Sequence, residues 1–313
     1  MADSPSRIRI ATRESRLAMT QTEHVAATLR ARHPGLAVEI VGMTTKGDRV
    51  LDRPLAEVGG KGLFIKELEV ALDEGRADIA VHSLKDVPME LPARFAISTF
   101  AEREVPLDAF VSGRYASPEA LPDGSLVGTS SLRRECQLRR AFPRLRFRAL
   151  RGNVNTRLAK LDAGDYDAII LAAAGLRRLG FGERIRAVLP DTLTVPAIGQ
   201  GILAIEYRRD RADLASLMAA FEHRDVAAAA HAERALGLVV EGSCTVPVGG
   251  FARVSGDTLS LEGFLGMPDG SRVVRSRASG RVDEAGKIGA DLGRRLLAAG
   301  GAEILRDLAA AKV

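Results

Sequence analysis

The first part of the chain has the pattern of apolar and polar positions that is typical of a strand followed by a helix. Residues 8–12, IRIAT, alternate as a half-buried strand does. After Leu17, the residues Gln21, Val25 and Leu29 recur at helical spacing, and residues 34–35, Pro-Gly, end the predicted helix. Residues 37–44 then predict a second strand, so the chain opens as a strand–helix–strand unit.

A long polar segment interrupts this pattern. Residues 45–62 are rich in glycine and predict a loop, whose composition fits a flexible surface loop as well as a lid over a site. A helix is expected at residues 63–73 and a short buried strand at residues 79–81. Pro88 cannot continue a β ladder, so the polar residues before it are expected in a loop.

The pattern then repeats. A strand ending at residues 127–129, a helix at 130–141, a strand at 146–150, a helix at 154–163 and a strand at 167–171 are expected. IATRES in the first half and VGTSSLRRE in the second both place Thr or Ser and Arg between a strand and a helix. This repetition predicts two similar α/β lobes, each offering a helix N-terminus and arginines to an anion.

The end of the chain differs from both lobes. Three strands followed by two helices predict a small C-terminal α+β domain after residue 225. We expect the chain to cross between the lobes near residues 103–106 and to return near residues 195–201, where proline and glycine favour a hinge. The expected domains are residues 1–102 with 200–220, residues 106–196, and residues 224–313.

Composition narrows the class of protein. The 313 residues contain no run near the ~18 apolar residues of a membrane helix, and the N-terminus lacks the apolar core of a signal peptide. Cys136 and Cys244 are the only cysteines and lie far apart in sequence, so we expect no disulfide framework and a cytoplasmic location.

The basic residues are mostly arginine. There are 45 Lys and Arg against 40 Asp and Glu, and the arginine guanidinium binds carboxylate or phosphate with two parallel hydrogen bonds. The excess of arginine therefore favours an anionic ligand. Nucleic acid is not expected, because the chain has no Trp and only 4% aromatic residues with which to stack bases.

Asp86 is the candidate catalytic residue. It lies with Ser83 and Lys85 in the loop after the strand at residues 79–81, and ligands of open α/β sheets bind beyond the carboxyl ends of strands. The alternative is an aspartate that caps a turn. The sequence has no metal-binding cluster, so no metal is expected. It also has no Ser-His-Asp order of the kind found in catalytic triads.

Cys244 is the second candidate. It lies in EGSCTVPVGG, where the flanking Gly, Ser and Thr favour an accessible thiol, although a lone cysteine is often a small buried apolar residue. Cys136 lies on a predicted helix and is expected to be structural.

Several segments together resemble the porphobilinogen deaminases, also called hydroxymethylbilane synthases. They follow the order of that family over about the first 250 residues. The segments are IRIATRES (8–15), VGGKGLFIKELE (58–69), HSLKDVP (82–88), VGTSSLRRECQL (127–138) with LRGNVNTRL (150–158), and PAIGQG (196–201) with EGSCTVP (241–247).

This resemblance implies two periplasmic-binding-protein-like lobes plus a C-terminal α+β domain. It implies that the chain condenses four porphobilinogens head-to-tail into hydroxymethylbilane and releases ammonia. It also implies a dipyrromethane cofactor bound to Cys244 through a thioether, with Asp86 as the catalytic acid. A monomer that binds no membrane and no nucleic acid is expected. The alternative is a two-lobed protein that binds a small anion without catalysis.

The resemblance also assigns binding residues. Those expected against the cofactor are Ser83, Lys85, Thr129, Ser131, Arg133, Arg134, Arg151 and Gln200. Those expected around the substrate are Arg13, Ser15, Gln21, Arg151, Arg157 and Arg178. The arginines are expected at helix starts and strand ends. The chain departs from the family at Ser243 and Thr245, where Gly and Gln are commoner, and at Arg16, where Pro is usual.

Overall fold

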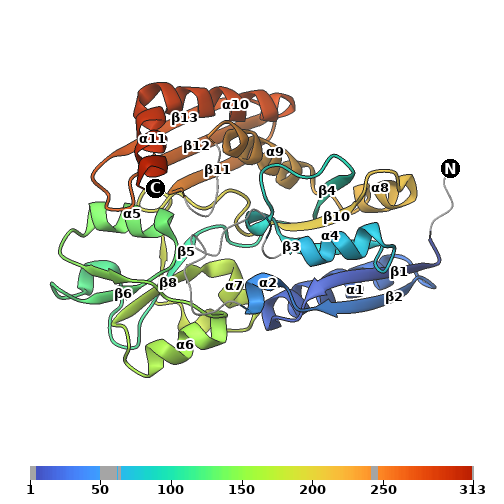
Figure 1. The fold of residues 1–313 in the computed structure, drawn as a ribbon, viewed down its shortest axis with the longest axis horizontal. Coiled ribbons are helices and arrows are strands. Elements are labelled where there is room, and N and C mark those ends of the chain that lie inside the picture. Colours follow the sequence, from blue (N-terminus) through green and yellow to red (C-terminus); the bar gives the residue numbers. More distant parts are fainter. Residues whose placement is uncertain (1–4, 50–61, 63–64, 241–245, 312–313) are drawn as a thin grey trace. The chain divides into compact units, whose positions relative to one another are not determined.

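The computed structural model describes residues 5–49, 62, 65–240 and 246–311. The chain forms two compact units. Unit 1 contains residues 1–104 and 202–227, and unit 2 contains residues 105–201 and 228–313. Figure 1 shows their strands and helices, and each unit is described separately below.

Unit 1 is built on a five-stranded sheet in the order β2-β1-β3-β10-β4. Strand β1 is parallel to β2 and β3, whereas β10 is antiparallel to β3 and β4. The strands are β1 (Arg7–Arg13), β2 (Ala37–Met43), β3 (Ile79–Ser83), β4 (Phe95–Phe100) and β10 (Leu203–Arg208).

Helices cover both faces of this sheet. Helices α1 (Arg16–Arg32) and α8 (Ala212–Ala219) pack on one face, against Ile8 and Ile10. Helix α4 (Lys66–Asp73) packs on the other face, against Ala11. The alternation in IRIAT thus sends successive side chains to two cores. The short helix α2 (Lys46–Arg49) lies within the segment that was expected to be a loop.

Unit 2 contains a second five-stranded sheet, in the order β7-β6-β8-β5-β9. Strand β6 is parallel to β7 and β8, and β5 is antiparallel to β8 and β9, so the arrangement repeats that of the first sheet. The elements are β5 (Asp108–Val111), β6 (Leu126–Gly128), α5 (Leu132–Ala141), β7 (Arg146–Arg148), α6 (Val154–Asp162), β8 (Ala168–Ala172), α7 (Ala173–Arg178) and β9 (Ala187–Leu189).

The C-terminal part of unit 2 is an antiparallel sheet with helices. The strands are β11 (Val248–Ser255), β12 (Thr258–Gly266) and β13 (Val273–Arg281), and the helices are α9 (Arg224–Val239), α10 (Ala285–Leu296) and α11 (Ala302–Ala310). Helices α9 and α10 approach closely at Gly289, where a Cβ atom would lie 2.1 Å from the carbonyl oxygen of Ala232. Glycine is required there because any side chain would collide with the backbone of α9.

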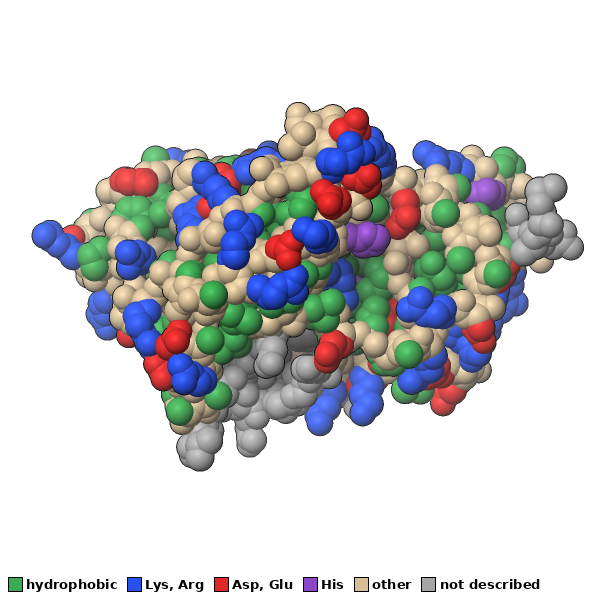
Figure 2. Space-filling view, turned by 90° about the horizontal axis from the view of Figure 1, so that it is seen from above, with side chains coloured by type: hydrophobic (Ala, Val, Ile, Leu, Met, Phe, Trp, Pro, Cys, Tyr) green, Lys and Arg blue, Asp and Glu red, His purple; other side chains and the backbone are tan. Residues whose placement is uncertain are grey.

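The predicted fold class is confirmed: two similar α/β sheets are accompanied by a small α+β part. The predicted elements lie close to the observed ones, but β4, β5, β9, β10, α7 and α8 were not predicted. On the face shown in Figure 2, basic side chains are interspersed with acidic ones and do not form one continuous patch.

Candidate functional site

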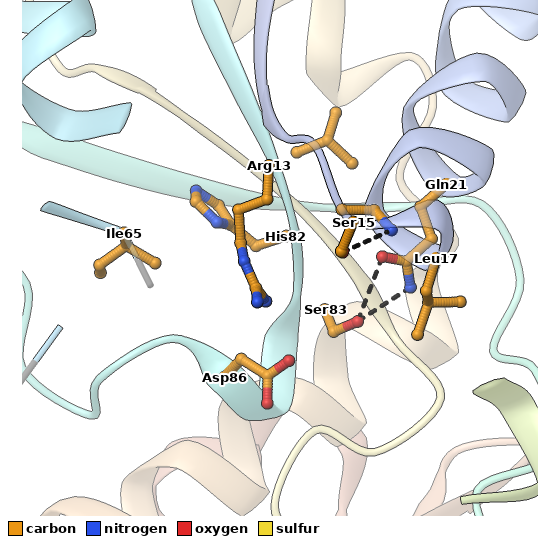
Figure 3. A pocket seen from close by; sticks show the side chains of 10 residues that line it. Arg13, Ser15, Leu17, Gln21, Ile65, His82, Ser83 and Asp86 are labelled. Atoms are coloured by element: carbon orange, nitrogen blue, oxygen red, sulfur yellow. Dashed lines mark hydrogen bonds between the residues drawn. The ribbon is translucent and has the colours of Figure 1, made fainter. Parts of the chain in front are cut away.

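A pocket opens in unit 1 at the carboxyl ends of the parallel strands β1 and β3 (Figure 3). Its empty volume is about 380 Å³, which includes space open to solvent. The pocket therefore lies where ligands of open α/β sheets bind. Its lining residues are Arg13, Ser15, Leu17, Ala18, Gln21, Ile65, Val81, His82, Ser83 and Asp86.

Asp86 is held at this pocket by a short 3-10 turn, Leu84–Asp86. Leu84 and Val87 on either side of Asp86 are buried, and the Leu84 N–H donates to the carbonyl oxygen of Ile202 at 2.9 Å. The turn is thus anchored while the Asp86 side chain is exposed and points into the pocket, toward Arg13 (Figure 3).

Helix α1 brings further polar groups to the pocket. Ser15 caps the helix by accepting a hydrogen bond from the Ala18 N–H at 3.4 Å. One turn later, Gln21 Nε2 donates to Ser83 Oγ at 2.8 Å, which joins α1 to the end of β3. Five of the predicted site residues therefore meet in one pocket: Arg13, Ser15, Gln21, Ser83 and Asp86.

A buried pair beside this pocket was missed in the sequence. His82 Nε2 lies 2.9 Å from Glu206 Oε2, and these side chains are 4% and 0% exposed. Glu69 of α4 interacts electrostatically with both groups. Burial and then the charge of Glu206 raise the pKa of Glu69 to about 7. One signal was available: Glu206 is a charged residue inside the apolar strand segment ILAIEY.

Unit 2 contains a cluster around Asp108. Arg134 Nε donates to Asp108 Oδ1 at 2.9 Å, and Arg133 Nη2 lies 2.9 Å from Asp108 Oδ2. Gln200 Nε2 also donates to Asp108 Oδ1 at 2.9 Å. Burial raises the pKa of Asp108, but the charges of Arg133 and Arg134 and the Gln200 hydrogen bond outweigh burial and hold it at about 2.

The two arginines of this cluster also bind backbone oxygens. Arg133 Nη1 donates to the carbonyl oxygen of Val195, and Arg134 Nη1 donates to that of Ile170 at 3.2 Å. Both side chains are buried, whereas the sequence led us to expect them directed at a ligand. The site thus binds one carboxylate, that of Asp108, within the protein itself.

The remaining predicted residues of unit 2 lie around the starts of α5 and α6 and the end of α7. Ser131 caps α5, and Thr129 Oγ1 accepts a hydrogen bond from the Ser131 N–H at 3.2 Å. Arg157 Nε donates to the Gly152 carbonyl oxygen at 2.7 Å. Arg178 ends α7 and donates to the Gly201 carbonyl oxygen at 2.8 Å, so its expected position at a helix start or strand end is wrong.

Arg151 comes just after Leu150, before α6 begins, and Lys85 lies in the turn next to Asp86. Cys244 lies outside the described residues. Cys136 is buried, and burial raises its pKa to about 12.

Within the described residues, no helix is long and apolar enough to cross a membrane. No group of three or more His, Cys, Asp or Glu side chains there is arranged to hold a metal ion.

Comparison with known proteins identifies relatives over nearly the whole chain. The chain is 58% identical to porphobilinogen deaminase of Chromobacterium violaceum, covering 94% of this chain and 95% of the relative. It is 56% identical to that of Paraburkholderia phytofirmans, covering 98% and 91%. A solved structure, that of the probable amino-acid ABC transporter extracellular-binding protein ytmK of Bacillus subtilis, is similar at a TM-score of 0.43. The match covers 70% of this chain and 90% of that chain at 14% identity, which is too weak to support an argument.

Two family models match in the expected order. Residues 8–216 match the dipyrromethane cofactor binding domain of porphobilinogen deaminase, and residues 227–298 match its C-terminal domain. The first match contains the pocket around Asp86 and the cluster around Asp108. The chain therefore belongs to the porphobilinogen deaminase family.

Proposed function

We propose that this member of the family condenses four porphobilinogens into hydroxymethylbilane at the pocket of unit 1, with Asp86 as the catalytic carboxylate. The observation that carries this proposal is the anchored turn at the end of β3, from which Asp86 points into a pocket that Arg13 also lines. The reaction is a transfer in tetrapyrrole biosynthesis, and ammonia leaves as each ring is added.

Asp86 acts electrostatically in this proposal. When ammonia leaves the aminomethyl group of the substrate, positive charge develops on the pyrrole that remains. A carboxylate fixed beside that pyrrole stabilises the charge as it forms, and a preorganised group does so without reorganisation. Arg13 binds a substrate carboxylate, while Ser15 and Gln21 order the wall of the pocket. Arg151, Arg157 and Arg178 are the further arginines that we assign to substrate carboxylates.

The donors of each unit are of the kind that the dipyrromethane cofactor requires. Its acetate and propionate groups need cations and N–H or O–H donors, and the Arg133–Arg134–Gln200 set already binds the carboxylate of Asp108. When bound, the cofactor supplies a covalently held primer to which new rings are added. We propose that the Cys244 thiol attaches it and that these residues hold its carboxylates: Ser83, Lys85, Thr129, Ser131, Arg133, Arg134, Arg151 and Gln200.

We also propose the three domains expected from the sequence, and a monomer in the cytoplasm that binds neither membrane nor nucleic acid. The mixture of basic and acidic side chains on the face in Figure 2 and the absence of Trp support the proposal that the protein does not bind nucleic acid. Light scattering on the purified protein tests the monomer. Titration with DNA and RNA at low and moderate salt tests for nucleic-acid binding, because the affinity of a protein for nucleic acid falls steeply with salt.

One experiment tests the proposed function most directly. The intact mass of the purified protein should exceed that of its sequence by two linked pyrrole units, and peptide mapping should place the addition on Cys244. Cys244→Ser should lack the addition because a hydroxyl is a far weaker nucleophile than a thiolate. Cys136→Ser is the matched control and should keep it. An unmodified protein that binds porphobilinogen without converting it would support the anion-binding alternative.

A further inference from the structure

His82, Glu206 and Glu69 form a titratable cluster beside the pocket that the proposed mechanism does not use. His82 lines the same pocket as Asp86, four residues later in the chain (Figure 3). Its Nε2 lies 2.9 Å from Glu206 Oε2. His82 lies on β3 and Glu206 on β10, and these strands are antiparallel neighbours within the sheet. The pairing of the two strands therefore holds the two side chains together.

The environment of Glu206 is unusual for a carboxylate. The side chain is 0% exposed, and among the described residues its Oε1 atom has no hydrogen-bond partner. A buried carboxylate oxygen without a donor is costly. The contact of Oε2 with His82 Nε2 at 2.9 Å is therefore the polar contact on which the Glu206 carboxylate depends.

Glu69 adds a second carboxylate from the facing helix α4. The groups that act on it are Glu206 and Asp73, which favour its protonated form, and Arg94 and His82, which favour its ionised form. Burial is the largest influence, and the pKa of Glu69 is raised to about 7. Two carboxylates and one imidazole thus interact with one another, and the Glu69 carboxyl group exchanges its proton near neutral pH.

We propose that His82, Glu206 and Glu69 form a proton-accepting cluster that takes up the proton released at the pocket each time a ring is added. The inference rests on the proposed function. For each ring, the substrate's C–N bond breaks and its electron pair leaves with ammonia, a C–C bond forms, and one C–H bond breaks with loss of a proton. The cluster accepts that proton through His82 and passes it to solvent before the next ring is added.

A separate acceptor has a clear chemical use here. If Asp86 kept the proton, it would no longer carry the negative charge that stabilises the next departure of ammonia. A neighbouring group that takes the proton leaves Asp86 ionised throughout the four additions. In this scheme His82 faces the pocket, and Glu206 and Glu69 are positioning residues that act through it.

The pH dependence of kcat tests this inference. Glu69 must be ionised to support His82 as an acceptor, so kcat of the cofactor-loaded wild type should fall as the pH drops below about 7. Glu69→Gln should lose this limb of the profile, whereas Glu74→Gln, which removes an exposed carboxylate that follows the same helix, should keep it. His82→Gln should lower kcat by on the order of 10², the usual effect of a positioned proton acceptor.

A spectroscopic measurement provides a readout that is independent of turnover. Infrared spectra of the wild type near pH 6 should contain a protonated carboxyl band that is absent from Glu69→Gln. Cofactor content by intact mass should be unchanged in Glu69→Gln and Glu206→Gln. An active wild type whose pH profile and carboxyl band are matched by both Gln variants would overturn the inference and leave the proposed function standing. A wild type that forms no hydroxymethylbilane would overturn the proposed function itself.

Discussion

Arg134 donates from Nε to Asp108 Oδ1 at 2.9 Å, and neither side chain is more than 8% exposed. With Arg133 on its other oxygen, Asp108 is a buried anion shared by two buried cations. Taking three charges out of water costs several kcal/mol for each ion, and hydrogen bonds within the cluster offset that cost. Removal of the central charge should therefore affect stability strongly.

We expect Asp108→Asn to lower the free energy of unfolding by about 3–5 kcal/mol, because it leaves two guanidinium groups buried without their anion. Urea unfolding at pH 7 measures this. The matched control is Asp123→Asn, which removes an exposed partner of Arg144 2.8 Å away, and exposed pairs contribute about 0–1 kcal/mol. Equal effects of the two substitutions would contradict the prediction.

The same group should give the protein an acid-sensitive stability. The folded-state pKa of Asp108, about 2, lies below its ordinary value of 3.8. The unfolded chain therefore binds the proton first as the pH falls, and this contribution to stability is complete above pH 3.8 and lost as the pH falls through about 2. Asp108→Asn should lose less stability than the wild type over that interval, as acid titration of the unfolding midpoint would show.

Glu69 should have the opposite effect on stability. Its folded-state pKa of about 7 lies above its ordinary value of 4.5, so between these values the folded protein keeps a proton that the unfolded chain releases. Wild-type stability should fall as the pH rises from 4.5 to about 7. Over this interval the stability of Glu69→Gln should rise relative to that of the wild type, and the difference should persist above pH 7. A pH-independent difference in urea midpoints would refute this.

Asp86 should respond to substitution through its charge. Asp86→Asn keeps the size but loses the charge, and loss of one preorganised electrostatic partner typically lowers the rate by a factor on the order of 10²–10³. Asp86→Glu keeps the charge one methylene further into the pocket and should retain small activity. It should also accumulate enzyme-bound, partly elongated chains, which native mass spectrometry detects. Near-normal turnover by Asp86→Asn would mean that Asp86 is only a turn residue.

The arginines should separate into two groups by cofactor content. Arg133→Leu and Arg134→Leu should block cofactor assembly. Arg157→Leu and Arg178→Leu should carry the cofactor but turn over substrate more slowly, because each lost charge-assisted hydrogen bond costs about 1.5–3 kcal/mol.

Intact mass and specific activity of each arginine variant are the measurements. Arg144→Leu, which removes an exposed arginine of the same unit, is the control and should change neither. Arg133 and Arg134 also hold Asp108, so their variants should be compared at a temperature where thermal unfolding shows that they are folded. Four variants with equal cofactor content and equal activity would mean that these arginines bind neither ligand.

Local patterns predicted most of the fold. Alternation in IRIAT and helical spacing in α1 are set by neighbouring residues, and the repeated Thr or Ser with Arg indicated the second sheet. Strand β10 was missed because its pairing with β3 and β4 depends on residues more than a hundred positions away. No local pattern contains that contact.

The candidate site was predictable to the same extent. Asp86 and Ser83 follow one strand, so the sequence places them together. Arg134 points inward because it binds Asp108, and no local sequence pattern indicates that Asp108 is buried. The partner of His82 is 124 residues away in the sequence. Charged groups in buried strands were the available signal, and their partners became visible only in three dimensions.

The position of β10 bears on how the protein is made. Strand β4 has β10 as its neighbour in the first sheet, and β10 is translated only after residue 202. All five strands of the second sheet lie within residues 108–189. During synthesis, the second sheet can therefore close while the first still exposes the edges of β3 and β4, which reverses the usual N-terminal-first order. Nascent chains stalled before residue 203 should present those open edges to chaperones or to one another.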